Sequence, residues 1–150
     1  MSERVVPTPV AQIDLPMADG AVIRVRRHGN PDGKLRVVAS NGNGFAIDGY
    51  YPFWSLLLER YDVVVFDMRN HGQNPTADPM NHDYDHMAAD MGTILDGVNA
   101  QWGKKPAIGA FHSMSGRAAM RDAVDIGWRW DALVLFDPPD IPLRPFTNVN

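Results

Sequence analysis

Short apolar runs alternate with longer amphipathic stretches along most of the chain. Runs of strand length with little polar alternation occupy residues 35–40, 62–67, 105–112 and 132–137. Runs of this kind are typical of parallel strands covered on both faces. Between them, apolar residues recur at helical spacing over residues 48–61, 82–102 and 114–127. The pattern predicts strands and helices in strict alternation.

A different pattern precedes these segments. Residues 10–18 and 21–28 are two β-like runs on either side of Asp19-Gly20, a combination that predicts a β-hairpin. The fold class expected is therefore α/β: a mostly parallel sheet flanked by helices, with an N-terminal hairpin. The helix over residues 82–102 should bury one face, formed by Met87, Met91, Ile94, Leu95 and Val98.

Composition narrows the functional class. The chain has 150 residues, enough for one domain, with a net charge of -4 and no cysteine. These values favour neither nucleic acid nor an acidic membrane as partner, and they exclude disulfides and thiolate metal sites. There is no signal-peptide pattern and no apolar run near the ~18 residues of a membrane span, so we expect a cytoplasmic protein. The glycine-rich segments lack a dinucleotide fingerprint and a P-loop lysine, so we expect neither cofactor nor metal.

Candidate chemistry lies where the predicted parallel strands end, because ligands of such sheets bind at the carboxyl ends of the strands. Ser113 falls on a predicted strand-to-helix turn. A serine there is exposed at the top of the sheet, and the N–H of Met114 points into the same space. Tight turns of this type need small residues two before and two after the serine; Ser115 is small, but Phe111 is not. The residues alone leave a nucleophile and a structural turn serine equally open.

Two further strand ends carry polar groups. The N–H groups of Asn43-Gly44-Phe45 are candidates for a second oxyanion donor, although a glycine turn without any ligand is the plainer interpretation. In the next loop, Asp67 and Arg69 could form a buried ion pair that holds the loop. His71 could be a base, but a structural role is the favoured interpretation.

Four motifs in this order resemble the N-terminal half of an α/β-hydrolase fold protein. Asn41-Gly42-Asn43-Gly44-Phe45 resembles that superfamily's H-x-N-G-F loop, with Asn41 in place of His. Residues 67–74 resemble D-x-R-G-H-G-x-S, and residues 111–116 resemble the nucleophile elbow G-H-S-M-G-G. The stretch ending in Asp137-Pro138 is similar to the sixth-strand signature. The resemblance covers roughly residues 10–140.

The resemblance implies roles for particular residues. Ser113 would be the nucleophile, and the N–H of Met114 would form the oxyanion hole with that of Gly44 or Phe45. His112 would be the residue that commonly precedes the nucleophile and would point away from it. Asp137, at the end of the sixth strand, is a possible catalytic acid. The favoured interpretation is that Asp137-Pro138 shapes the start of a cap and that the acid follows the seventh strand, outside these residues.

The resemblance also implies what must come from elsewhere. In this superfamily the acid and then the histidine follow the nucleophile, and the histidine comes after the eighth strand. Residues 1–137 would be the N-terminal part of the hydrolase core, and residues 138–150 the start of a lid, cap or linker. We therefore expect an apolar edge at the sixth strand and a C-terminal companion fragment or chain that carries the histidine.

These observations favour a serine hydrolase that cleaves an ester, amide or related acyl bond of a small molecule. A non-catalytic, hydrolase-like binding or assembly module is the alternative, favoured by Phe111 and by Asn41 at the position of the family's histidine. Relatives with a carboxylate nucleophile are disfavoured because Ser113 holds that position.

Overall fold

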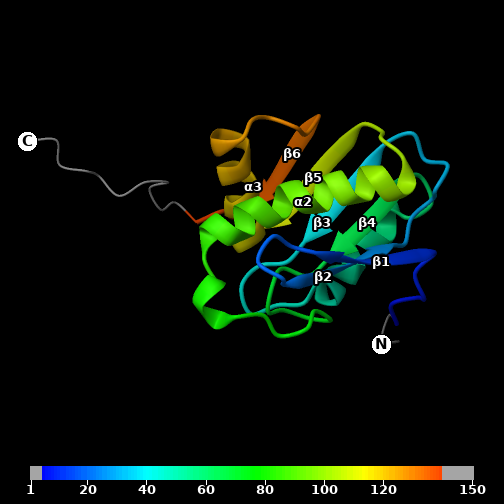
Figure 1. The fold of residues 1–150 in the computed structure, drawn as a ribbon. Helices are drawn as coiled ribbons and strands as arrows, with labels where there is room; N and C mark the ends of the chain where they lie inside the picture. Colours follow the sequence, from blue (N-terminus) through cyan, green and yellow to red (C-terminus); the bar gives the residue numbers. More distant parts are fainter. Residues whose placement is uncertain (1–4, 140–150) are drawn as a thin grey trace, which may run out of the picture.

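A computed structural model describes residues 5–139, which form a six-stranded sheet between layers of helix (Figure 1). The strands are β1 (Ala11–Pro16), β2 (Val22–Arg27), β3 (Arg36–Ser40), β4 (Asp62–Phe66), β5 (Ala107–His112) and β6 (Ala132–Phe136). The α-helices are α1 (Tyr51–Trp54), α2 (Tyr84–Trp102) and α3 (Met114–Asp125). Three 3-10 helices complete the elements: η1 (Ile47–Tyr50), η2 (Ser55–Leu57) and η3 (Pro79–Asn81).

The order of the strands in the sheet is β1-β2-β4-β3-β5-β6. β2 pairs antiparallel with both β1 and β4, whereas β3, β4, β5 and β6 are mutually parallel. The predicted hairpin and the predicted mostly parallel sheet are thus confirmed. The four parallel strands end at the same edge, which brings their C-terminal loops together.

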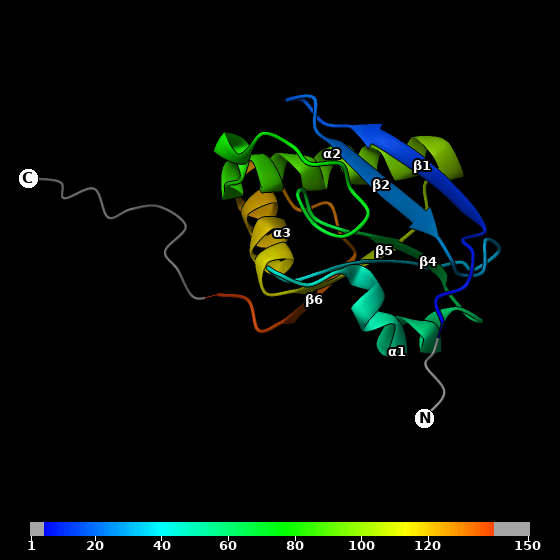
Figure 2. The ribbon, with the colours of Figure 1, turned by 90° about the horizontal axis from the view of Figure 1, so that it is seen from below.

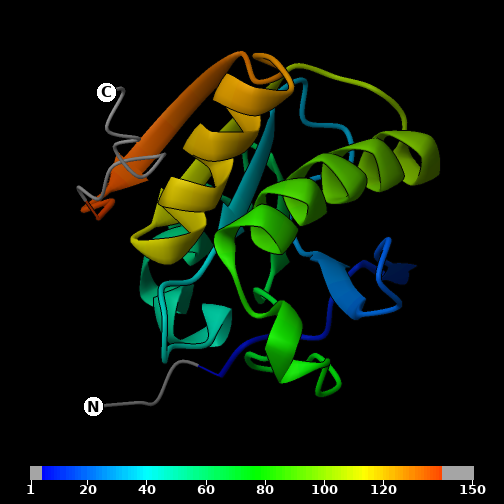
Figure 3. The ribbon, with the colours of Figure 1, turned by 60° about the vertical axis from the view of Figure 1, so that its left-hand side comes forward.

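The two faces of the sheet are covered unequally. Helices α2 and α3 lie side by side over one face (Figure 3), and the short α1 lies on the opposite side (Figure 2). The larger core lies under α2 and α3 and includes the predicted helix face: Met87, Met91, Ile94, Leu95 and Val98. The smaller core surrounds Trp54, which is completely buried.

The helix expected to start near Tyr51-Pro52, within residues 48–61, begins there but is much shorter than predicted. The α-helix begins at Tyr51 with Pro52 in its first turn, but it ends after one turn and is flanked by 3-10 segments. Side-chain contacts explain the difference, because the aromatic residues here face different surfaces. The Trp54 indole donates to the Ile47 carbonyl at 3.0 Å, whereas the Tyr50 hydroxyl contacts the loop after β3. Tertiary contacts override the helical periodicity.

The sheet has an apolar edge at β6, as expected from the sequence. Val134 is 45% exposed and Phe136 42% exposed, although both lie in a strand. The predicted lid or linker over residues 138–150 falls mostly on residues 140–150, which lie outside the described part of the chain. Within residues 5–139, no helix combines the length and the apolar character needed to span a bilayer.

Candidate active site

Three loops meet at the carboxyl ends of β3, β4 and β5. The first is Asn41–Phe45, the second runs from Asp67 to Asn74, and the third is the turn between β5 and α3. Met68 N–H donates to Asn41 Oδ1 at 2.8 Å, which joins the first two loops. A Cβ added to Gly42 would lie 3.3 Å from the Cβ of Ser113, so the first loop also packs against the third. The sequence-predicted segments are therefore close in space.

Ser113 occupies a strained position between β5 and α3. Its φ of 48° and ψ of -109° lie outside the usual regions for a residue with a Cβ. The turn is fixed from both sides: Ser113 N–H donates to the Phe136 carbonyl at 2.8 Å, and the buried Ser115 hydroxyl donates to the His112 carbonyl at 3.0 Å. Such a strand-to-helix elbow exposes the serine at the top of the sheet.

Phe111, which the steric argument disfavoured, fits because its ring points into the core. It is fully buried and contacts Trp130 edge-on, with ring centroids 5.4 Å apart. Gly109 makes the space, since a Cβ there would lie 2.4 Å from the Phe111 ring. The bulk at this position is therefore accommodated without blocking the elbow.

Two polar groups at the turn between β5 and α3 have no hydrogen-bond partner in the described part of the chain. Neither Ser113 Oγ nor Met114 N–H has a hydrogen-bond partner among residues 5–139. Met114 is the first residue of α3, and the N–H groups of a first helical turn have no partner within the helix. A hydroxyl and an N–H that have no partner among residues 5–139 thus lie at adjacent positions.

Asn41 organises the turn opposite the elbow. Its side chain is completely buried, and Nδ2 donates to the carbonyls of Gly42 at 2.9 Å and Phe45 at 2.7 Å. Its Oδ1 accepts the Met68 N–H described above. The Asn41 side chain therefore holds the turn to the end of β4.

The predicted second oxyanion donors are already engaged in this structure. Gly44 N–H donates to His71 Nε2 at 3.1 Å, and Phe45 N–H donates to the Gly42 carbonyl at 3.2 Å. Within the same turn, Asn43 N–H has no hydrogen-bond partner between residues 5 and 139. Of the three N–H groups that the sequence singled out, the one from Asn43 is available.

The loop after β4 is held by side chains that turn inward. The Asp67 carboxylate accepts from Ile47 N–H at 2.7 Å and from Gln73 N–H at 3.2 Å. Gly72 has a φ of 51°, and a Cβ there would lie 2.1 Å from the Asp67 carboxyl carbon. His71 uses both ring nitrogens: Nδ1–H donates to the Arg69 carbonyl at 2.8 Å, and Nε2 accepts Gly44 N–H. These contacts favour the structural interpretation of His71.

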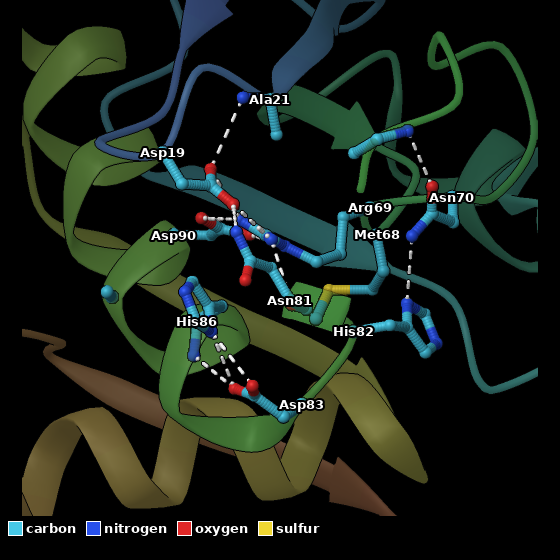
Figure 4. A network of polar contacts seen from close by, with 12 residues as sticks. Asp19, Ala21, Met68, Arg69, Asn70, Asn81, His82, Asp83, His86 and Asp90 are labelled. Carbon is cyan, nitrogen blue, oxygen red and sulfur yellow. Dashed lines mark hydrogen bonds and ion pairs between the residues drawn. The ribbon is translucent and has the colours of Figure 1, made fainter. Parts of the chain in front are cut away.

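The predicted Asp67–Arg69 pair is wrong. Arg69 turns the other way and forms a buried network with Asp19 and Asp90 (Figure 4). Its guanidinium donates to Asp90 at 2.7 and 2.8 Å and to Asp19 at 2.8 and 3.2 Å. The hydrogen bonds from Arg69 lower the pKa of Asp19, and although burial opposes the charge of Arg69, the two carboxylates raise its pKa. The network ties the hairpin turn to α2 and fixes where the loop after β4 begins.

No base for Ser113 comes from the described residues. The five histidines of the chain are His28, His71, His82, His86 and His112. None of them forms a hydrogen bond with Ser113 in the described structure. Asp137 is exposed, with a φ of 47°, directly after the Phe136 carbonyl that holds the elbow. It lies near the site without contacting a histidine there.

A cavity of about 810 Å³ opens between the loops after β3 and β4. Asn43 and Phe45 form part of one wall, and His71 and His82 form part of another. The cavity therefore reaches the turn that carries the free Asn43 N–H. Between residues 5 and 139, no group of three or more histidine, aspartate or glutamate side chains is placed to hold a metal ion.

The sheet order, the strand-to-helix turn at Ser113 and the turn opposite it match the N-terminal half of an α/β-hydrolase fold. The chain belongs to the alpha/beta hydrolase family, whose family model matches residues 37–149. The hydrogen bonds that join Tyr50 to the turn and to His112 were not predicted, because nothing local marks a tyrosine whose partner is 62 positions away.

Solved structures with the same fold were also found. An α/β-hydrolase fold protein from Burkholderia ambifaria aligns with a TM-score of 0.74 and 19% identity, covering 93% of this chain and 48% of its own. An esterase from Exiguobacterium antarcticum aligns with 0.70 and 22%, covering 83% and 44%. An esterase from a Rhodococcus species aligns with 0.70 and 22%, covering 84% and 45%. The chain therefore spans about half the length of the solved structures that it resembles.

Proposed function

We propose that this chain carries the nucleophile half of a serine hydrolase that cleaves an ester, amide or related acyl bond. One observation carries the proposal. Ser113 is held at a strained elbow with its hydroxyl unpaired among residues 5–139, beside the free N–H of Met114 and opposite a turn with a second free N–H at Asn43. A structural turn serine would use its hydroxyl to satisfy the turn, as Ser115 does.

The chemistry follows from these groups. Ser113 Oγ attacks the carbonyl carbon while a base takes its proton, and the carbonyl oxygen becomes an oxyanion. Met114 N–H stabilises that oxyanion, and Asn43 N–H is the second donor in this proposal, in place of the engaged N–H groups of Gly44 and Phe45. The oxyanion collapses, the leaving group departs with the proton, and water then hydrolyses the acyl-enzyme.

The base and its orienting acid belong, in this proposal, to a C-terminal companion fragment or chain. The solved relatives are about twice as long as this chain. Asp137 is retained as a possible acid, since it follows the strand that holds the elbow. A small-molecule acyl substrate would reach the site across the cavity that Asn43 and Phe45 help to line.

The test is the intact mass of the purified protein before and after a fluorophosphonate probe. In this reaction Ser113 Oγ bonds to phosphorus and fluoride leaves. We expect one adduct, lost in Ser113→Ala and retained in Ser55→Ala, a matched serine variant away from the elbow. The measurement is made on the chain alone and on a longer form that includes the companion part.

The alternative, a non-catalytic binding or assembly module, predicts a different result. It is favoured by the observation that no histidine of the described structure forms a hydrogen bond with Ser113. If the longer form also stays unlabelled while remaining folded, Ser113 is not an activated nucleophile and the hydrolase proposal fails.

A further inference from the structure

The Tyr50 hydroxyl lies between the turn after β3 and the nucleophile elbow. It accepts a hydrogen bond from Gly42 N–H at 3.1 Å and lies 2.5 Å from His112 Nδ1. Gly42 directly precedes Asn43, and His112 directly precedes Ser113. A single hydroxyl therefore joins the neighbours of the two residues that the proposed reaction uses.

Two arrangements of hydrogen fit the contact between Tyr50 and His112. A phenol has one hydrogen to donate, and Gly42 N–H occupies one of its two acceptor positions. Tyr50 donates to Nδ1 when a neutral His112 carries its proton on Nε2, and it accepts from Nδ1–H in the other tautomer. In either arrangement the hydroxyl is paired with one tautomer of His112.

Tyr50 is itself held in place from behind. It is the last residue of η1, and the first residue of η1, Ile47, donates its N–H to the buried carboxylate of Asp67 at 2.7 Å. The Ile47 carbonyl accepts from the indole of Trp54, which is completely buried. The hydroxyl thus projects from a segment anchored at both ends to the core.

Close packing at the junction leaves little room for an alternative arrangement. A Cβ on Gly42 would lie 2.6 Å from His112 Nδ1, so only glycine permits this approach. The Phe45 ring meets both partners edge-on, with centroids 6.3 Å from Tyr50 and 6.1 Å from His112. The three rings form one cluster between the turn and the elbow.

We propose that Tyr50 is a positioning residue of the acyl-transfer site. By bridging Gly42 N–H and His112 Nδ1, its hydroxyl sets the separation between Asn43 N–H on the turn and Ser113 on the elbow. The functional part rests on the hydrolase proposal above. An oxyanion hole divided between two loops stabilises the transition state only while the loops keep their spacing, because a misplacement of about 1 Å can cost about a hundredfold in rate.

The test compares Tyr50→Phe with Tyr51→Phe. Each variant removes one hydroxyl, but Tyr51 packs edge-on against Trp54, and its hydroxyl forms no hydrogen bond with either loop among residues 5–139. Nitrogen-15 spectra of the His112 ring at mildly alkaline pH report the tautomer, and amide hydrogen exchange reports whether Gly42 N–H is held. Both measurements use the 150-residue chain and need neither base nor substrate.

In Tyr50→Phe we expect loss of the single His112 tautomer and Gly42 exchange faster by about tenfold, because a buried N–H loses its acceptor. Tyr51→Phe should match the wild type in both readouts. If Tyr50→Phe leaves both readouts unchanged, the bridge does not hold the loops and the proposal is overturned.

Fluorophosphonate labelling of the longer form then separates this proposal from the one on which it rests. If the wild-type protein reacts with the probe, we expect Tyr50→Phe to react about tenfold more slowly and Tyr51→Phe to react at the wild-type rate. The double variant Tyr50→Phe/His112→Phe should react no more slowly than His112→Phe, since coupled residues are not additive. Equal rates for wild type and Tyr50→Phe overturn the positioning role, whereas an unlabelled wild type overturns the hydrolase proposal and leaves the bridge to be decided by the spectra.

Discussion

The loops after β4 and β5 share a strained backbone position but differ in how the strained residue uses its side chain. Each contains a non-glycine residue at positive φ, Asn70 at 62° and Ser113 at 48°. Asn70 uses its side chain to fold the loop: Oδ1 accepts Ala77 N–H at 2.7 Å, and Nδ2 donates to His82 Nδ1 at 3.1 Å (Figure 4). Ser113 forms no side-chain hydrogen bond with residues 5–139. Strain alone therefore does not distinguish the two loops; what distinguishes Ser113 is a side chain without a hydrogen bond in the described structure.

The largest effect should come from breaking the loop after β4 at its base. Arg69→Met leaves the carboxylates of Asp90 and Asp19 without their partner, and Asp90 is buried. We expect a loss of about 3–5 kcal/mol in the free energy of unfolding, measured with urea. The control Arg24→Met removes the exposed pair with Asp14 and should cost far less stability, because solvent screens an exposed ion pair. Similar losses in both variants would mean that the buried network does not hold the loop.

The second prediction concerns an unpaired polar group away from both loops. His28 is 7% exposed, and its ring packs against Trp54. Neither of its ring nitrogens has a hydrogen-bond partner among residues 5–139. Burial, aided by the charge of Arg26 and opposed by Asp48, lowers the pKa of His28 from 6.5 to about 4. The unfolded chain therefore binds a proton between pH 6.5 and 4 that the folded chain does not, and stability falls as the pH falls through this window.

The expected loss for His28 is about 3 kcal/mol between the two pH limits. Urea unfolding of the wild type and His28→Leu across this window measures it. The variant should lose less stability on acidification, because leucine takes up no proton in either state. Parallel curves for the two proteins would show that His28 is protonated equally in both states. An unpaired buried group can thus be a cost to stability with no connection to a site.

The features that the sequence predicted are local along the chain, whereas those that it missed join residues far apart in the sequence. The four parallel strands and the buried face of α2 were predicted because burial dictates local apolar patterns. Ser113 and the turn formed by Asn41–Phe45 could be singled out as candidates because each belongs to a motif of consecutive residues. Partners far apart along the chain were not found: Arg69 and Asp19 are 50 positions apart, and Tyr50 and His112 are 62 apart. No local pattern encodes such pairs.

The third prediction tests whether the side-chain hydrogen bonds of Asn70 stabilise the loop after β4. Asn70→Gly removes the strain of a positive φ, which asparagine tolerates well, and it also removes the hydrogen bonds to Ala77 and His82. The lost hydrogen bonds should outweigh the relief, and we expect a loss of about 1 kcal/mol in urea unfolding. An increase in stability would mean that the Asn70 side chain contributes nothing to the loop, and the contrast with Ser113 would disappear.

The smallest expected effect has the opposite sign. Ser113→Gly relieves the same kind of strain, but the serine side chain has no hydrogen bond with residues 5–139 to lose. We expect a gain of about 1 kcal/mol in the free energy of unfolding, together with complete loss of fluorophosphonate labelling. Ser113→Ala separates the two effects, because alanine keeps the strain: it should lose labelling without gaining stability. If Ser113→Gly is no more stable than Ser113→Ala, the elbow stores no strain at this residue, and its positive φ cannot be counted in favour of a nucleophile.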